Sequence, residues 1–521
     1  MHKARRILGI MQQIRVGSAK SKRSHGDRGA HSYRCNQFDP TRHRPVARAV
    51  NRGVSRADAC AATHPSGSTH WSRGRDCASK LATVMKASRM SYHFLLASWG
   101  TLGNLSPLLT AGRRLRRNGH QVRVMADPAM RAEVEAAEFE FVTWRRAPTG
   151  EAADPTDISD MQDWMRRTLF DPASAYAADI RDEIGRVPTD AVLTLDMLFG
   201  AALGAEATDT PFALLSPHIS IRPLPGMPPA TSGLSQPKTP EERAEVDALS
   251  ARLAEMLNSL LPILNQARAD LGLRELADVM DLFDRADRLL LAISEAFDFQ
   301  ADSLPDNFRY VGPLLDVPNW SKSLQPTSWQ APWSARSSRP RALIACSTGA
   351  QGQRDLFLRV INAMGAVEID ALATTGPNLD LADLRAPANV VVIRGAPHDL
   401  VMKDVSVVIS QGGHGTVTRS LINALPQLIL PMGRDQADNA ARVEAKGAGL
   451  RLPPAASETE ITAAVRRLTT EPQFKAAARL LGEAIKADID RSSLVDQMEA
   501  IAAVGHAARQ PLMKRKLRGT A

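Results

Sequence analysis

The sequence predicts an α/β protein with two doubly wound parallel sheets, each in a Rossmann-like domain of its own. Short apolar runs alternate with stretches of helical spacing in two separate arrays, and such alternation is typical of parallel sheets. The first array begins at Tyr92–Ala97 and the second at Ala342–Cys346. Residues 314–340, which contain prolines, tryptophans and serines, separate the arrays and predict a linker. A chain of 521 residues is long enough for two such domains with sizeable cores.

The first domain is expected to cover residues 90–313. Helical spacing predicts a helix from Pro107 to Asn118, closed by Gly119. The segment 221–240 holds six prolines and is expected to be a long irregular loop, which in a compact domain is usually functional or disordered. Short apolar runs predict its strands at 92–97, 121–125, 191–195 and 212–215.

The second domain is expected to cover residues 341–490. Helical spacing from Glu458 to Ile489 predicts the helices that complete it. Residues 508–521 form a basic tail without an evident role. The apolar runs that predict the strands of this domain lie at 342–346, 368–373, 390–393, 405–409 and 428–430.

The charge of the chain is unevenly distributed. Residues 1–90 carry a formal charge of +15, whereas the remainder carries −6, so the overall +9 does not describe the folded body. A mildly acidic body argues against nucleic acid as a partner. Residues 1–89 lack sustained apolar periodicity. We expect them to be a disordered basic extension, or the result of a start placed upstream of the true one at Met90.

The sequence also bears on the compartment and on metals. No basic segment is followed by the apolar run of a secretory signal, and no apolar run approaches the ~18 residues of a transmembrane helix. Of the four cysteines, Cys35, Cys60 and Cys77 lie in the extension and Cys346 lies in the body. This distribution predicts neither a disulfide framework nor a zinc site, so a cytoplasmic protein is expected.

The segment 411–416, with the sequence QGGHGT, is the most informative part of the chain. It follows the apolar run 405–409 and precedes helical spacing at 417–425. A glycine turn between a strand and a helix lets backbone N–H groups and the helix dipole meet an anion such as a phosphate. Asp435 and Gln436 follow the next predicted strand and would lie at the same sheet edge, where doubly wound folds bind ligands. Their donors and acceptors suit sugar hydroxyls.

These segments resemble the donor-binding signature of family 1 glycosyltransferases with the GT-B fold, especially the bacterial macrolide-transferase-like branch. The family pattern is roughly H-G-G-x-G-T, then G-x-P, a short strand ending in proline, D-Q and N-A-x-R-V. Further matches are V-G-P at 311–313, S-T-G at 347–349 and P-H-D at 397–399, and the resemblance covers roughly residues 91–507. The residues that match the main pattern in order are Gly412, Gly413, Gly415, Thr416, Pro426, Pro431, Asp435, Gln436, Asn439, Ala440, Arg442 and Val443.

The resemblance implies a GT-B enzyme whose two domains face each other across a cleft. The loop 221–240 would lie over the acceptor side, and residues 491–507 would form a closing helix that returns to the first domain. The implied activity is that of an inverting hexosyltransferase that uses a UDP- or dTDP-sugar and a small, fairly apolar acceptor (a natural product, a lipid or a phenol-like compound). No metal or other cofactor is implied, because a helix start can hold the diphosphate and no convincing D-x-D motif is present.

The matching positions imply a donor site with two departures from the family. Gln411 stands where relatives usually have a diphosphate-binding His, and an amide cannot carry charge. Arg419 stands where many relatives have a ribose-binding Glu, so it either contacts phosphate or lies on an exposed helix face. We expect His414 to fill the loop and His398 to line the nucleotide site. The implied donor-binding residues are Ser347, Thr348, His398, Gln411, Gly412, Gly413, Gly415, Thr416, Asp435 and Gln436.

On the acceptor side, the sequence departs from the family pattern more seriously than on the donor side, at Asn104. Relatives place a His or Asp in the loop after the first strand as the general base, which contributes about 10²–10⁴ in rate. Here that loop holds Asn104, and an amide cannot usefully accept the proton. Asp196, directly after the strand 191–195, matches the carboxylate that orients the base in relatives. Asn104 and Asp196 are therefore the candidate catalytic positions, although Asn104 can equally cap the helix that follows.

Three explanations of Asn104 stay open. In the first, Asp196 takes the acceptor proton directly or through water. In the second, the acceptor is acidic or an amine and needs little assistance from a base. Alternatively, the protein is a non-catalytic nucleotide-sugar-binding or helper protein with the same fold. A dehydrogenase is disfavoured, because no G-x-G-x-x-G follows the first strand with an acidic residue about 20 positions on.

Overall fold

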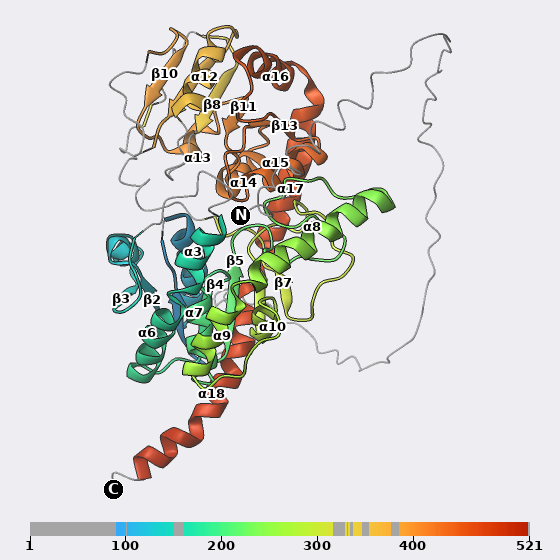
Figure 1. The fold of residues 1–521 in the computed structure, drawn as a ribbon. Helices are drawn as coiled ribbons and strands as arrows, with labels where there is room; N and C mark the ends of the chain where they lie inside the picture. The colour runs from blue at the N-terminus through green and yellow to red at the C-terminus, as the bar shows by residue number, and fades with distance from the viewer. Residues whose placement is uncertain are drawn as a thin grey trace, which may run out of the picture. The chain divides into compact units, whose positions relative to one another are not determined.

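The computed structural model describes residues 90–100, 102–150, 161–315, 329–330, 332–333, 337–345, 354–376 and 385–518, without the side chains of 509–518. The expected extension 1–89 and most of the expected linker 314–340 lie outside this described part. Within it, the chain forms two parallel sheets (Figure 1). The prediction of two doubly wound α/β domains is thereby confirmed.

The first sheet has seven strands in the order β3-β2-β1-β4-β5-β6-β7, and all neighbouring pairs are parallel. The chain moves outward from β1 to β3 and then returns to β4 on the other side of β1. The order therefore reverses between β1 and β4, which is where doubly wound sheets bind ligands. The strands are β1 His93–Ala97, β2 Gln121–Ala126, β3 Glu140–Thr143, β4 Ala191–Leu195, β5 Phe212–Ser216, β6 Arg288–Leu291 and β7 Phe308–Tyr310.

The second sheet has six parallel strands in the order β10-β9-β8-β11-β12-β13. Its order reverses between β8 and β11, so the residues that follow β11 emerge at the second switch point. The strands are β8 Arg341–Ala345, β9 Asp370–Thr374, β10 Val390–Ile393, β11 Val407–Ser410, β12 Gln427–Ile429 and β13 Gly449–Arg451.

Small residues allow the helices around β4 to pack closely. Helix α7, Phe199–Glu206, lies against α6, Ala173–Arg186, and a Cβ added at Gly200 would collide with the carbonyl oxygen of Ala173. All residues of β4 and β5 are buried. The ends of these two strands are therefore held rigidly, which suits positions that present functional side chains.

The helix after β1 begins earlier than the sequence predicted. Helix α3 spans Leu102–Arg117 and includes Pro107, whereas the proline pattern suggested a start at Pro107 itself. Proline removes only one backbone hydrogen bond here, in the second turn, and buried Leu105, Leu108 and Leu109 secure the helix on both sides of it. Asn104 consequently lies within the first turn of α3 and not in a loop.

The last helix, α18, spans Leu494–Arg518 and packs against α3 and β4 (Figure 1). It continues beyond the expected end at 507, through most of the basic tail. No helix in the described ranges is long and apolar enough to span a membrane. The other α-helices are α4 Arg131–Ala136, α5 Met161–Met165, α8 Pro240–Asn258, α9 Leu261–Asp270, α10 Asp281–Arg285, α12 Arg354–Met364, α13 His398–Val401, α14 His414–Ile422, α15 Gln436–Ala445, α16 Glu458–Thr470 and α17 Pro472–Asp490.

Candidate functional site

The glycine turn after β11 has the geometry of an anion-binding helix start. Gly412 has φ of +94°, and a Cβ there would lie 2.5 Å from Cγ2 of Ile429, so only glycine fits. Gly413 is the N-cap of α14, and no side chain caps this helix. A Cβ built on Gly413 would meet nothing within 4 Å, so the space beside the turn is open. Backbone N–H groups at the start of α14 are thus available to a negatively charged ligand.

Side chains around this turn hold its shape. The Ser410 hydroxyl accepts from the Gly412 N–H at 3.1 Å, and the Asn439 amide donates to the Gly412 carbonyl at 2.9 Å. Gln411 is buried beside them. Burial lowers the pKa of His414, whose ring packs edge-on against Phe297 at 5.8 Å. His414 is therefore a neutral side chain that fills the turn, in the way the sequence suggested.

The loop before α15 brings Asp435 and Gln436 to the same edge of the sheet. One carboxylate oxygen of half-buried Asp435 accepts from the Asn439 amide at 2.9 Å. Gln436 is buried, and its Oε1 accepts from the N–H groups of Met432 at 2.7 Å and Gly433 at 3.2 Å. The carbonyl oxygen of Gln436 therefore holds the loop in position, and Asp435 lies half-buried beside it.

His398 and Arg419 are linked to the ends of other elements and to the glycine turn. His398 Nε2 is 3.0 Å from the Thr374 hydroxyl, at the end of β9, and burial lowers the pKa of His398 to about 4, so the ring is neutral. Arg419 pairs with Asp399 at 3.3 Å and donates to the Gly415 carbonyl, also at 3.3 Å. Arg419 thus lies beside the turn instead of on a bare helix face. Ser347 and Thr348 lie outside the described residues.

On the acceptor side, the structure does not join Asn104 to Asp196. Asn104 donates from Nδ2 to the Trp99 carbonyl at 3.1 Å, which fixes the turn before α3. Asp196 is buried directly after β4, with an exposed fraction of 2%. No hydrogen bond links these two side chains in the described part of the chain.

The imidazole beside Asp196 comes instead from His218, which the sequence reasoning missed. His218 follows β5 by two residues, and its Nε2 lies 3.3 Å from Oδ1 of Asp196. Burial is the largest influence and disfavours the imidazolium, but Asp196, the Ile219 carbonyl and Asp435 together outweigh it and raise the pKa of His218 to about 9. Strands β4 and β5 are parallel neighbours, so the residues after both meet at one edge. That adjacency was the signal that could have identified His218.

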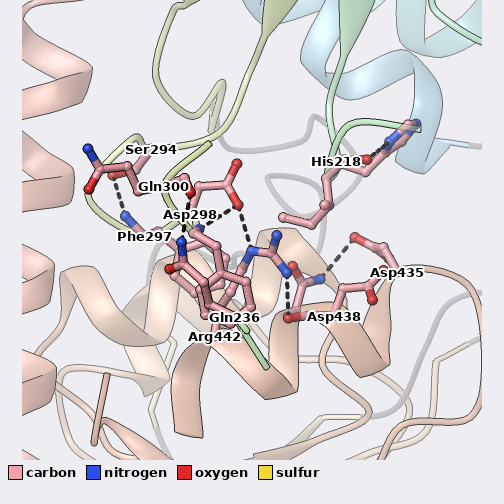
Figure 2. A network of polar contacts seen from close by, with 12 residues as sticks. His218, Gln236, Ser294, Phe297, Asp298, Gln300, Asp435, Asp438 and Arg442 are labelled. Carbon is pink, nitrogen blue, oxygen red and sulfur yellow. Dashed lines mark hydrogen bonds and ion pairs between the residues drawn. The ribbon is translucent and has the colours of Figure 1, made fainter. Parts of the chain in front are cut away.

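Helix α15 also binds two segments of the first array. Figure 2 shows one of these contacts, the pair of Arg442 with Asp298. The Asp438 carboxylate accepts from the Thr231 N–H at 2.6 Å and from the Gly233 N–H at 2.8 Å, within the proline-rich segment. Arg442 donates from Nε to Asp298 at 2.7 Å, and each side chain is only 1% exposed. The stretch that contains the D-Q and N-A-x-R-V motifs therefore attaches α15 to segments of the first array through Asp438 and Arg442.

Comparisons with known proteins show what this chain is similar to. A family described as "Erythromycin biosynthesis protein CIII-like, C-terminal domain" matches residues 359–501. The 4'-demethylrebeccamycin synthase of Lentzea aerocolonigenes is 27% identical over 439 residues, which cover 79% of this chain and 99% of that protein. A PGL/p-HBAD biosynthesis glycosyltransferase of Mycobacterium tuberculosis is 32% identical over 188 residues, 36% of this chain and 41% of that protein.

Solved structures share the fold. The glycosyltransferase of kitacinnamycin has a TM-score of 0.63 at 21% identity, over 79% of this chain and 99% of that one. The calicheamicin glycosyltransferase CalG4 has a TM-score of 0.63 at 19% identity, over 80% of this chain and 99% of that one. The described part of the chain therefore has the two-sheet architecture of these enzymes.

Proposed function

We propose a specific reaction for this chain, which belongs to the family 1 glycosyltransferases with the GT-B fold. It transfers a hexose from a UDP- or dTDP-sugar to a hydroxyl of a small, fairly apolar acceptor, with inversion at the anomeric carbon. The observations that carry the proposal are an open helix start, a half-buried carboxylate at the start of the next helix and an ionisable His–Asp pair. These are the turn Gly412–Thr416, Asp435, and Asp196 with His218.

The donor side supports a nucleoside diphosphate sugar. The start of α14 offers backbone N–H groups and the positive end of a helix dipole, which favour the two negative charges of a diphosphate. Asp435 offers carboxylate oxygens to sugar hydroxyls from the adjacent helix start. We propose that the diphosphate is held in this way without a divalent cation.

The reaction is a single displacement. The acceptor oxygen forms a bond to the anomeric carbon while the bond from that carbon to the diphosphate oxygen breaks. The nucleoside diphosphate leaves with the electron pair, and donors at the start of α14 stabilise the developing charge. Attack from the face opposite the leaving group inverts the anomeric configuration.

Product analysis tests the proposal. Purified protein is incubated with UDP- and dTDP-hexoses and a panel of phenolic and alcohol acceptors, with and without EDTA. We expect nucleoside diphosphate release and a glycoside whose anomeric coupling constant shows inversion, both insensitive to EDTA. If EDTA abolishes turnover and magnesium restores it, only the claim that the diphosphate is held without a divalent cation is contradicted.

A helper protein is the second candidate, and one observation favours it. Asn104 stands at the position of the usual base, and its amide is committed to the Trp99 carbonyl, so it cannot take a proton. A helper protein would bind the nucleotide sugar in calorimetry yet give no glycoside with any acceptor, including acidic phenols that need no base.

A further inference from the structure

The carboxyl ends of β4 and β5 carry a His–Asp pair that no matching motif of the family pattern predicted. Asp196 follows β4, and His218 lies in the turn after β5, the neighbouring parallel strand. The His218 side chain is 23% exposed, whereas that of Asp196 is 2% exposed. A small molecule can therefore reach the imidazole while the carboxylate behind it stays shielded from water.

We propose that His218 is the general base of this enzyme, with its positive charge balanced by Asp196, in place of the base missing at Asn104. The inference rests on the proposed glycosyl transfer. It replaces the earlier alternative in which Asp196 itself takes the proton, because the imidazole is 23% exposed and the carboxylate only 2%.

The contacts of the ring fix the tautomer that a base needs. Nδ1 of His218 lies 3.0 Å from the Ile219 carbonyl, to which it must donate, and 3.3 Å from the Ser216 hydroxyl. The proton of neutral His218 is thus on Nδ1, and the lone pair is on Nε2. Asp196 Oδ1 lies 3.3 Å from Nε2 but makes no hydrogen bond among the described residues. Nε2 is therefore free to accept a proton, and the resulting imidazolium lies beside a carboxylate.

The proton balance of the step is simple. As the acceptor oxygen bonds to the anomeric carbon, its proton moves to Nε2 of His218. The nucleoside diphosphate carries away the electron pair of the broken bond. The imidazolium, stabilised by Asp196, then loses its proton to water after the products leave.

Charges around the ring predict an alkaline pH profile. Asp196 is the main charged neighbour, and Asp435 before α15 also raises the pKa of His218, while His414 on α14 is neutral. With the pKa of His218 at about 9, most of the base is protonated at neutral pH. The rate with an aliphatic alcohol should therefore rise about tenfold per pH unit and level off near that pKa.

The same strand offers a matched control at its other end. Asp190 lies just before β4, and its Oδ1 is 3.0 Å from Nδ1 of His506 on α18. The Asp190 side chain is 1% exposed and that of His506 is 32% exposed, much like the first pair. This second His–Asp pair lies at the amino end of the strand, away from the glycine turn and the ligand edge.

The experiment compares His218→Gln with His506→Gln in the full chain. At pH 9, turnover with an aliphatic alcohol should fall about 10²–10⁴-fold in His218→Gln and stay near the parent value in His506→Gln. An acidic phenol that is already ionised should be glycosylated by His218→Gln at close to the parent rate. The affinity for UDP or dTDP should be unchanged in both variants. If His218→Gln unfolds early in a thermal melt, His218→Asn takes its place.

Several outcomes would overturn the inference. One is parent-like turnover of the alcohol by a folded His218→Gln protein, and another is an equal loss with the alcohol and the ionised phenol. A parent rate that falls as pH rises would show that His218 acts as a cation and not as a base. If the parent protein glycosylates neither acceptor, the proposed function fails as well. If the parent protein transfers the sugar and His218→Gln does so at the same rate, only the inference about His218 is contradicted.

Discussion

The donor side and the acceptor side of the candidate site are built in different ways. The described donor residues around the glycine turn and α15 come mainly from one continuous stretch, 410–439, around consecutive strands β11 and β12. The acceptor-side residues Asp196 and His218 follow β4 and β5, and Asn104 follows β1. In the proposed reaction, the donor side would bind largely through backbone geometry, whereas the acceptor side would depend on two side chains that meet across strands.

This difference has a chemical reason. A diphosphate can be held by N–H groups and a helix dipole, which any sequence with the right turn provides. Proton transfer needs an ionisable group of suitable pKa at one place, and only side chains supply it. Substitutions on the acceptor side should therefore change rate and pH dependence, and those on the donor side should change affinity.

The largest expected effect comes from the pair that joins the two sides. Asp298→Ala leaves the buried Arg442 guanidinium without its carboxylate, and breaking a buried pair typically costs about 3–5 kcal/mol of unfolding free energy. Denaturant unfolding measures the loss. Asp302→Ala, which removes an exposed partner of Arg243, is the control and should shift the midpoint much less. Equal shifts would mean that the buried pair does not secure the two sides.

Asp196→Asn tests whether the negative charge of Asp196 raises the pKa of His218 and supports the rate. Without the carboxylate the pKa of His218 should fall, so the inflection of the pH–rate profile moves to lower pH. The rate on the high-pH plateau should drop about 10–100-fold, because the imidazolium of the transition state loses its partner. An unmoved inflection would show that Asp196 does not face the titrating base.

Asp435→Ala tests the donor side. We expect affinity for the nucleotide sugar to weaken about 10–100-fold, since a hydrogen bond to a charged group is worth about 1.5–3 kcal/mol. Affinity for free UDP or dTDP should stay nearly intact, because the glycine turn is unchanged. Isothermal titration with both ligands decides the matter, and equal losses would place Asp435 away from the sugar.

Asn104→His should have the smallest effect. Asp196 already faces His218, and Asn104 makes its hydrogen bond with Trp99, so a new imidazole would have no carboxylate to orient it. Turnover of an alcohol acceptor should change by no more than about twofold. A large increase, with a new ionisation near the ordinary pKa of imidazole at roughly 6.5, would show that Asp196 can serve both positions.

The sequence predicted those features that local patterns express. Alternating apolar runs and helical spacing predicted the two parallel sheets, which the structure confirms. Gly412, Asp435 and their neighbours could be proposed as donor residues because the donor motif is continuous in the chain. The start of α3 was misjudged because a proline usually marks the beginning of a helix, whereas buried leucines carry this helix through it. The roles of Ser347 and Thr348 stay predictions, since both lie outside the described residues.

By itself, then, the sequence determined the kind of fold, the glycine turn and the family, because each is encoded over short stretches by backbone preference and periodicity. Only the tertiary structure decided which imidazole stands beside Asp196 and what Gln436 and Arg442 hold together. His218 reaches Asp196 because β5 pairs with β4, a contact between residues separated by a helix and a turn in the chain. Such meetings depend on the order of strands in a sheet, and no local pattern in a single sequence records that order.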